Sequence, residues 1–384
     1  MAGLSSRGPT RSCWRAVVNT PACTACSSRM SRHTQIRHPA GIERRIERLW
    51  YGDSVIGKAV SLAMLPFSLM FHIVVALRRL AYHRGWFAST RIAVPVVVVG
   101  NIVVGGTGKT PLVAAFVQRL TGQGIRVGIV SRGYGRATDR GPVIVAPDST
   151  VADVGDEPLL LARRTGVPVC VCRDRIAAAN MLVREADVEI IFSDDGLQHY
   201  RLRRDLEIAV IDGVRGIGNG FMLPAGPMRE PAGRLDAVDF VFVNGRPGTI
   251  DGLGLDGRAF DAHAFELEPD GVIALDGIST GRLERFAGQR VWALAGIGNP
   301  QRFFTMLASA GIDALPVDVP DHGRVSLSQL RDRHAWPILM TEKDAVKYPG
   351  KPVADAWYVP VDARMAPDSE AIVMRRMQQL LRQV

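Results

Sequence analysis

The sequence contains few cysteines, and those it has do not suggest a disulfide framework. They are Cys13, Cys23, Cys26, Cys170 and Cys172. Cys23 and Cys26 have no second pair of ligands at zinc-site spacing, which argues against a structural zinc. Cys170 and Cys172 alternate in an apolar run that is typical of a buried strand. We therefore expect free thiols in a reducing compartment.

Acidic residues are absent from positions 1–42, where six arginines lie. The net charge of +9 thus falls to about +3 for the rest of the chain. A body this mildly basic argues against a nucleic-acid groove. Because residues 1–42 also lack apolar periodicity, we expect a disordered basic tail. The alternatives are a mitochondrial targeting segment and a true start at Met30.

Formal charge is also missing from residues 59–77, a run of nineteen positions. Nineteen helical residues span about 28 Å, close to the hydrocarbon thickness of a bilayer. Polar residues and one proline weaken a full span, whereas Lys58 and Arg78 at its ends suit anionic lipid headgroups. We expect residues 43–88 to be a membrane-associating helical segment, either spanning the bilayer or lying in one leaflet. A buried core helix is the soluble alternative.

After this segment, short apolar runs alternate with helical patterns, which predicts an α/β fold whose mostly parallel sheet has helices on both faces. The expected strands are 94–99, 127–130, 143–145, 167–171, 188–192, 208–211, 240–243, 291–295, 314–319, 338–340 and 357–361. The expected helices are 111–121, 157–164, 173–186, 234–237, 300–310 and 369–382. We place a boundary near residue 285, between a larger domain over 89–285 and a smaller C-terminal α/β domain over 286–384.

The first predicted strand leads into residues 105–110, which read Gly-Gly-Thr-Gly-Lys-Thr. A strand, a glycine-rich loop, a Lys-Thr pair and a helix in this order are typical of a P-loop, whose backbone N–H groups surround phosphate. We expect Lys109 to reach the β- and γ-phosphates and Thr110 to hold Mg²⁺. Val103 stands where the usual motif has glycine. The expected nucleotide-binding residues are Gly105, Gly106, Thr107, Gly108, Lys109 and Thr110.

Two carboxylates, Asp194 and Asp195, follow another predicted strand. They lie where a Walker-B aspartate belongs and can bind Mg²⁺ directly or through water. The alternative is an acidic turn, since Asp-Gly is a common turn pair. Taken with Lys109 and Thr110, the two carboxylates favour a metal–nucleotide site.

Two further residues are candidates for proton transfer. Asp156 precedes the helix expected over 157–164, where carboxylates often only cap the helix. Near a γ-phosphate, however, a carboxylate can accept the proton of an attacking hydroxyl. His322 lies in a loop bounded by proline and glycine, and the alternative for it is an exposed loop histidine. The residues alone leave both alternatives open.

These motifs occur in an order that resembles one family, the tetraacyldisaccharide 4′-kinases of lipid A biosynthesis. The resemblance covers about residues 45–380, and the family also tolerates a residue other than glycine where Val103 stands. The matching blocks are Trp50-Tyr51, 100–111, 131–136, 154–158, 194–199, 223–231, Asp321-His322 and 341–344. Gly323 and Leu197 depart from the residues common in the family, which are bulkier and aromatic respectively.

The resemblance implies a kinase that uses ATP and Mg²⁺ to phosphorylate the 4′-hydroxyl of a tetraacyldisaccharide 1-phosphate, giving lipid IVA. It implies a lipid substrate in the membrane and a C-terminal domain that closes over the nucleotide. Because ATP is the donor, we expect the cytoplasmic face of the inner membrane of a Gram-negative-type bacterium. We expect no nucleic-acid or protein partner. The rival function is a P-loop GTPase or metallochaperone. Such a protein needs a motif that reads the nucleotide base, and residues 341–344 contain the residues of that motif in the wrong register.

The resemblance also implies roles for individual residues. Asp156 resembles the catalytic base and His322 its partner, with Lys109 completing the catalytic set. Residues expected around the metal are Thr110, Asp194, Asp195 and Glu230. Residues expected to face the anionic lipid headgroup are Arg132, Tyr134 and Arg136.

Overall fold

The computed structural model describes residues 42–52, 54–137, 141–245, 253, 260–319, 323–349 and 353–383. Residues 1–41 of the predicted tail and the pair Asp321-His322 lie outside the described residues, whereas Ile42 begins a helix.

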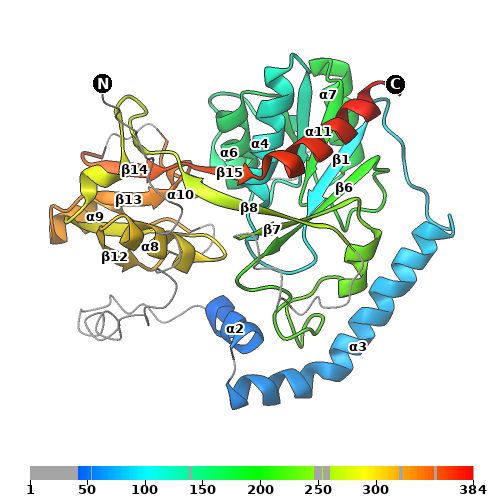
Figure 1. Ribbon diagram of the computed structural model, residues 1–384, viewed down its shortest axis with the longest axis horizontal. Coiled ribbons are helices and arrows are strands. Elements are labelled where there is room, and N and C mark those ends of the chain that lie inside the picture. The colour runs from blue at the N-terminus through cyan, green and yellow to red at the C-terminus, as the bar shows by residue number, and fades with distance from the viewer. Residues whose placement is uncertain are drawn as a thin grey trace, which may run out of the picture. The chain divides into compact units, whose positions relative to one another are not determined.

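Within the described residues, nine strands form one sheet, which we call the large sheet (Figure 1). Its order is β15-β8-β7-β6-β1-β5-β2-β4-β3. The inner strands pair in parallel, and β15 and β3 are antiparallel at the two edges. The strands are β1 (Val96–Gly100), β2 (Val127–Ser131), β3 (Val143–Ile144), β4 (Val169–Val171), β5 (Ile190–Asp194), β6 (Leu206–Asp212), β7 (Phe240–Asn244), β8 (Ala262–Pro269) and β15 (Val361–Met365).

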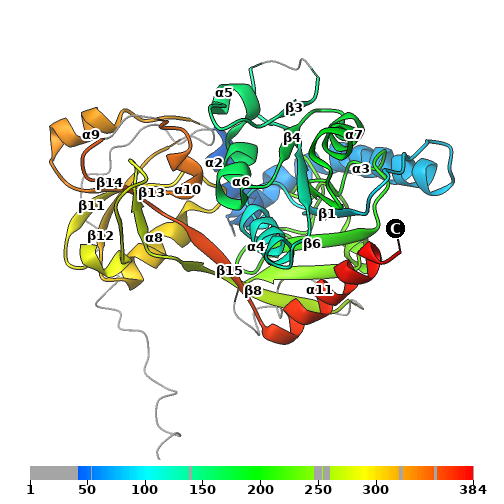
Figure 2. The ribbon, with the colours of Figure 1, turned by 90° about the horizontal axis from the view of Figure 1, so that it is seen from above.

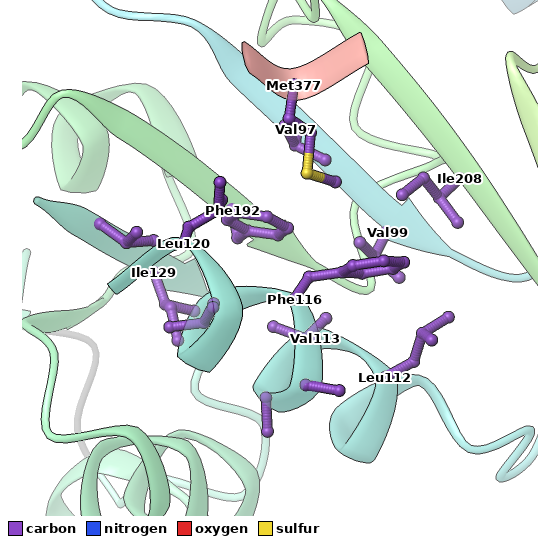
Figure 3. Close-up of a cluster of buried hydrophobic side chains, with 14 of the residues drawn as sticks. Val97, Val99, Leu112, Val113, Phe116, Leu120, Ile129, Phe192, Ile208 and Met377 are labelled. Atoms are coloured by element: carbon purple, nitrogen blue, oxygen red, sulfur yellow. The ribbon is translucent and has the colours of Figure 1, made fainter. Parts of the chain in front are cut away.

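Helices cover both faces of the large sheet, as predicted. Alternate residues of β1 enter two different cores: Val96 and Val98 pack with α7 (Arg175–Ala186). Val97 and Val99 pack with α4 (Lys109–Gly122) and α11 (Pro367–Leu381). Figure 3 shows side chains of α4 and Met377 of α11 around the second of these clusters. Every residue of β1 is buried because both faces are covered, which explains its continuous run of valines.

The remaining described strands form the small sheet, in the order β10-β9-β14-β13-β11-β12. They are β9 (Val272–Ala274), β10 (Thr280–Gly281), β11 (Arg290–Leu294), β12 (Asp313–Val317), β13 (Ile338–Thr341) and β14 (Ala356–Val359). The other helices of the two sheets are α5 (Val151–Val154), α6 (Asp156–Thr165), η2 (Ala232–Ala237), η3 (Leu283–Phe286), α8 (Pro300–Ser309), α9 (Leu327–Arg333) and α10 (Glu342–Ala345). The predicted helix over 234–237 is thus the 3₁₀-helix η2.

The chain does not divide at a single boundary near residue 285, as the sequence predicted, because segments on both sides of that position contribute to each sheet. β9 and β10 precede that position and yet belong to the small sheet, whereas β15 and α11 return to the large sheet. The return is fixed by antiparallel pairing of β15 with β8 and by burial of Val373 and Met377 in the core of the large sheet. Figure 2 shows β8 and β15 side by side where the chain passes between the sheets.

The predicted apolar segment forms helix α3 (Val55–His83), preceded by α2 (Ile42–Tyr51). Within the described part of the chain, α3 is the one helix long and apolar enough to cross a membrane. Little of its apolar stretch is buried, and exposed side chains include Phe67, Leu69 and Ile73. The helix continues through Pro66, so the proline does not divide it.

Candidate active site

The glycine-rich loop lies between β1 and α4, as predicted. Gly108 is the N-cap residue of α4 and has a φ of 93°, a conformation that favours glycine. Because glycine has no side chain to cap the helix, the first N–H groups of α4 are available to an anion. A side chain would also not fit, because a Cβ on Gly108 would lie 2.4 Å from Nδ2 of Asn244.

Two asparagine side chains hold the loop from outside. Nδ2 of Asn101 donates to the carbonyl of Gly105 at 3.2 Å, and Nδ2 of Asn244 donates to the carbonyl of Thr107 at 3.0 Å. Sequence reasoning did not single out Asn244. The available signal was a polar residue at the carboxyl end of a strand in a parallel sheet, which is the edge where such folds bind ligands.

The Asp194–Asp195 pair lies at the carboxyl end of β5, whose last residue is Asp194, and beside the loop. Asp195 has a φ of 49°, which is uncommon for a residue other than glycine. Buried Arg175, which sequence reasoning missed, donates to the carbonyls of Asp194 at 2.5 Å and of Asp195 at 3.2 Å. Two cations meet the Asp195 carboxylate, Lys109 at 3.3 Å and Arg229 at 3.0 Å. Burial alone would raise the pKa of Asp195, but these cations hold it well below its usual range.

Asp194 has the opposite electrostatic environment. Burial, followed by the charges of Glu157 and Asp195, raises its pKa to about 7 despite Lys109 and Arg175. Its Oδ1 is buried and has no hydrogen-bond partner among the described residues, and the same holds for Oγ1 of Thr107. Orphaned oxygens beside a phosphate loop fit a Mg²⁺–nucleotide complex, because the cation and its water would satisfy them.

The described residues contain no group of three or more His, Cys, Asp or Glu side chains arranged to hold a metal. Glu230, the other expected metal residue, is buried and accepts a hydrogen bond from the Tyr200 hydroxyl. Its second oxygen lies 3.6 Å from Nε of Arg234 and accepts from Gln198 at 3.4 Å.

Asp156 is the first residue of α6 and is buried. Its Oδ1 accepts the N–H of Glu157 at 3.0 Å. Gly155 before it has a φ of 91°, and a Cβ there would lie 2.7 Å from the carbonyl of Tyr134, so only glycine allows this approach. From the small-sheet side, Nζ of Lys343 lies 3.8 Å from Oδ2 of Asp156 and 3.1 Å from Oε1 of Glu157. The sequence singled out only the block containing Lys343, not this contact.

The three residues expected at the lipid headgroup separate in the structure. Arg132 and Tyr134 follow β2 and line the main cavity. Arg136 instead donates to the carbonyls of Gly141 and Val171, both at 3.3 Å.

The cavity has a volume of about 1480 Å³ and connects several parts of the fold. It includes the P-loop, Asp156, Asp194 and Asp195, together with residues of the small sheet and its helices. It also extends to Trp50 of α2 and to one side of α3. The α3 residues that line it are Phe71, Val74, Val75 and Arg78. One cavity therefore joins the predicted phosphate site to the apolar helix.

Comparisons with known proteins agree with this arrangement. A family model described as LpxK, tetraacyldisaccharide-1-P 4′-kinase, matches residues 60–378. Over 307 residues the chain is 50% identical to the tetraacyldisaccharide 4′-kinase of Alkalilimnicola ehrlichii, covering 79% of this chain and 89% of that one. Over 346 residues it is 46% identical to the enzyme of the same name from Chromobacterium violaceum, covering 87% and 98%.

A solved structure is similar in fold. The crystal structure of LpxK from Aquifex aeolicus in complex with ATP superimposes with a TM-score of 0.69 at 24% sequence identity. The match covers 84% of this chain and 99% of that one.

Proposed function

The chain belongs to the tetraacyldisaccharide 4′-kinase family, and we propose that it transfers the γ-phosphate of ATP to the 4′-hydroxyl of a tetraacyldisaccharide 1-phosphate. The observation that carries this proposal is the single cavity between the P-loop and α3. A kinase for a lipid acceptor needs a phosphate site and an apolar approach in one space. Phosphoryl transfer then asks the protein mainly to position the two substrates and to neutralise charge.

The phosphate side of the cavity is formed by the P-loop and the residues around Asp195. Lys109, which pairs with Asp195 in this structure, would bind the β- and γ-phosphates through the same ammonium group. Thr110, Asp194 and Asp195 would hold Mg²⁺, which when bound neutralises phosphate charge. Arg175 keeps both aspartates at the loop through their carbonyls.

Asp156 is the proposed acceptor of the hydroxyl proton. It lines the same cavity as Lys109 and Asp195, and Lys343 places a positive charge beside it. Arg132 and Tyr134, on the loop that packs against Gly155, are proposed to contact the anionic headgroup. The assignment of His322 as partner of Asp156 stays a prediction, because His322 lies outside the described residues.

We further propose that α3 lies in the membrane interface rather than across the bilayer. One side of the helix contacts the protein body along much of its length: Oγ of Ser61 accepts from Asn219, Oγ of Ser68 donates to the carbonyl of Met222, and Arg78 donates to the carbonyl of Gln198. The other side exposes apolar side chains, as in helices that are buried in one leaflet. Because ATP is the proposed phosphate donor, we propose that the enzyme works on the cytoplasmic face of the inner membrane.

The rival function, a P-loop GTPase switch, requires a carboxylate that reads a guanine base. Asp344, the acid of the candidate motif, is buried and accepts hydrogen bonds from the Gly296 N–H at 2.8 Å and from Thr341 at 2.6 Å. It also pairs with Lys347 at 2.8 Å. Because these contacts give the Asp344 carboxylate a structural role, they argue against its use for reading a guanine base.

The test is incubation of the full chain with γ-labelled ATP and tetraacyldisaccharide 1-phosphate in detergent micelles. Label should appear in the lipid, and the Lys109→Ala variant should transfer none because the γ-phosphate loses its cation. Label found only in free phosphate, or transfer from γ-labelled GTP but not from γ-labelled ATP, would contradict the proposal.

A further inference from the structure

We propose that Asn244 and Arg302 are positioning residues for the phosphate-binding loop, and that the small-sheet part of the protein thereby sets the affinity for the nucleotide phosphates. The inference rests on the proposed use of this loop for ATP. Asn244 and Arg302 line the same cavity as the loop, and the role proposed for them is to hold the loop.

Asn244 is the last residue of β7, and its side chain is packed directly beneath the loop. It is buried, and its Nδ2 donates to the carbonyl of Thr107 at 3.0 Å. The space is filled so closely that a Cβ on Gly108 would lie 2.4 Å from this nitrogen. The amide therefore fixes both the position of the loop and the direction of one peptide group.

The direction of that peptide group decides what the loop can bind. In a trans peptide, the carbonyl and the N–H of the next residue point in opposite directions. When the Thr107 carbonyl is held by Asn244, the N–H of Gly108 points away from Asn244 and toward the open side of the loop. Phosphate binding by a loop of this kind depends on such convergent N–H groups.

Arg302 connects this arrangement to α8, on the small-sheet side of the structure. Its NH2 donates to the main-chain carbonyl of Asn244 at 2.9 Å and lies 3.5 Å from Oδ1 of Asp212. Asp212 is buried at the end of β6, and its other oxygen accepts from Asn299 at 3.4 Å. The start of α8 is thus held to the ends of two strands of the large sheet, β6 and β7.

A backbone contact shows independently that the small-sheet part meets the loop. Gly298 lies so close to Gly106 that a Cβ on Gly298 would be 2.2 Å from the Gly106 nitrogen. Movement of α8 and the residues before it would therefore reach the loop by two routes, the Gly298 contact and the Arg302–Asn244–Thr107 chain of hydrogen bonds.

The experiment measures nucleotide binding separately from phosphoryl transfer. The full chain is titrated with ATP and Mg²⁺ without lipid, and KM is then determined for ATP and for the lipid acceptor. Asn244→Asp keeps the size of the side chain but replaces the donor with an oxygen that repels the Thr107 carbonyl. We expect a rise of about 10- to 100-fold in the Kd and KM for ATP, because a buried donor is lost and an acceptor is left unsatisfied.

Arg302→Gln tests the second link and leaves the Asn244 side chain in place. The expected rise in Kd for ATP is about 3- to 10-fold, the range for one hydrogen bond, with KM for the lipid unchanged. Arg302→Lys should recover part of the affinity, since it keeps one charged donor. The matched control is Arg290→Gln, which removes an exposed ion pair with Asp313 on the same sheet and should leave Kd unchanged.

The results separate this proposal from the proposed function. If the wild-type chain does not bind ATP, both fail. If wild type binds ATP and transfers phosphate while Arg302→Gln keeps the wild-type Kd, only the positioning role is overturned. An equal rise in KM for ATP and for the lipid in both variants would indicate general structural damage and would also overturn it.

Discussion

The close contact between Gly298 and Gly106 can be tested by adding a single methyl group to Gly298. A Cβ on Gly298 would lie 2.2 Å from the nitrogen and 2.8 Å from the Cα of Gly106. Optimal contacts between such atoms are about 3.5 Å, so the two backbones must separate by about 1 Å in Gly298→Ala. The nitrogen and the Cα of Gly106 are backbone atoms, which cannot move aside as the end of a side chain can. Overpacking of this kind costs about 1–3 kcal/mol of free energy.

The strain should appear as a loss of ATP affinity, because the displaced group is a loop amide expected to face phosphate. A cost of about 1–3 kcal/mol corresponds to a rise in Kd of about 5- to 150-fold. The assay is equilibrium titration of the full chain with ATP and Mg²⁺, paired with a urea denaturation curve. Gly122→Ala is the control, because a Cβ there meets no heavy atom within 4 Å.

Refutation would come from a Gly298→Ala protein that is less stable to urea but binds ATP as the wild type does. That result would show that the strain is relieved away from the loop. The reasoning from the contact to the nucleotide would then be wrong, although the contact itself would stand.

Three other predictions follow from the site and from α3. Asp156→Asn should lower kcat by about 10²–10⁴-fold while Kd for ATP changes by less than about 3-fold, as expected for a lost general base; normal turnover would exclude Asp156 as the base. Burial, with nearby arginines, lowers the pKa of His199 to about 4. Below pH 6.5 the unfolded chain therefore takes up a proton that the folded chain does not, and the free energy of unfolding falls as the pH drops toward 4. Between pH 7 and pH 5, urea denaturation should show that the free energy of unfolding falls by about 1 kcal/mol more for wild type than for His199→Gln, a value that takes the partial exposure of His199 into account. Equal losses would contradict the lowered pKa of His199. The double variant Leu69→Lys with Ile73→Lys should no longer sediment with anionic vesicles. The control Ile278→Lys, at an exposed apolar residue away from α3, should bind the vesicles as wild type does. Unchanged binding by the double variant would rule out this face of α3 as the membrane surface.

Much of the fold could be read from local patterns. The valines of β1 and the glycine-rich loop predicted a buried parallel strand followed by a helix, and the structure has β1 and α4 there. Helix α7 begins at Arg175 rather than at residue 173, because the Asp174 side chain accepts the N–H of Ile176 and caps the helix. Cys170 and Cys172 are buried free thiols, as expected from their alternation in an apolar run.

The predictions were weaker where residues far apart in the sequence meet. The return of β15 and α11 to the large sheet depends on pairing with β8 and on a core that includes Val97 and Phe116, more than two hundred residues earlier in the chain. No local pattern indicates this return. Arg229 was part of a predicted block, yet its ion pair with Asp195 became visible only in the folded chain. The same is true of Lys343, which reaches Asp156 from the small-sheet side.

The sequence by itself predicted the phosphate loop, the apolar helix and the family of this protein, and it singled out the carboxylates that we propose for a metal and a proton. These depend on residue types at short spacings, which local backbone geometry converts directly into a loop, a cap or a strand end. Only the tertiary structure decided that α3 lies along the protein body and lines the same cavity as the loop. It also decided that Asn244 and Arg302 hold that loop, because hydrogen bonds between distant segments exist only once both sheets are assembled.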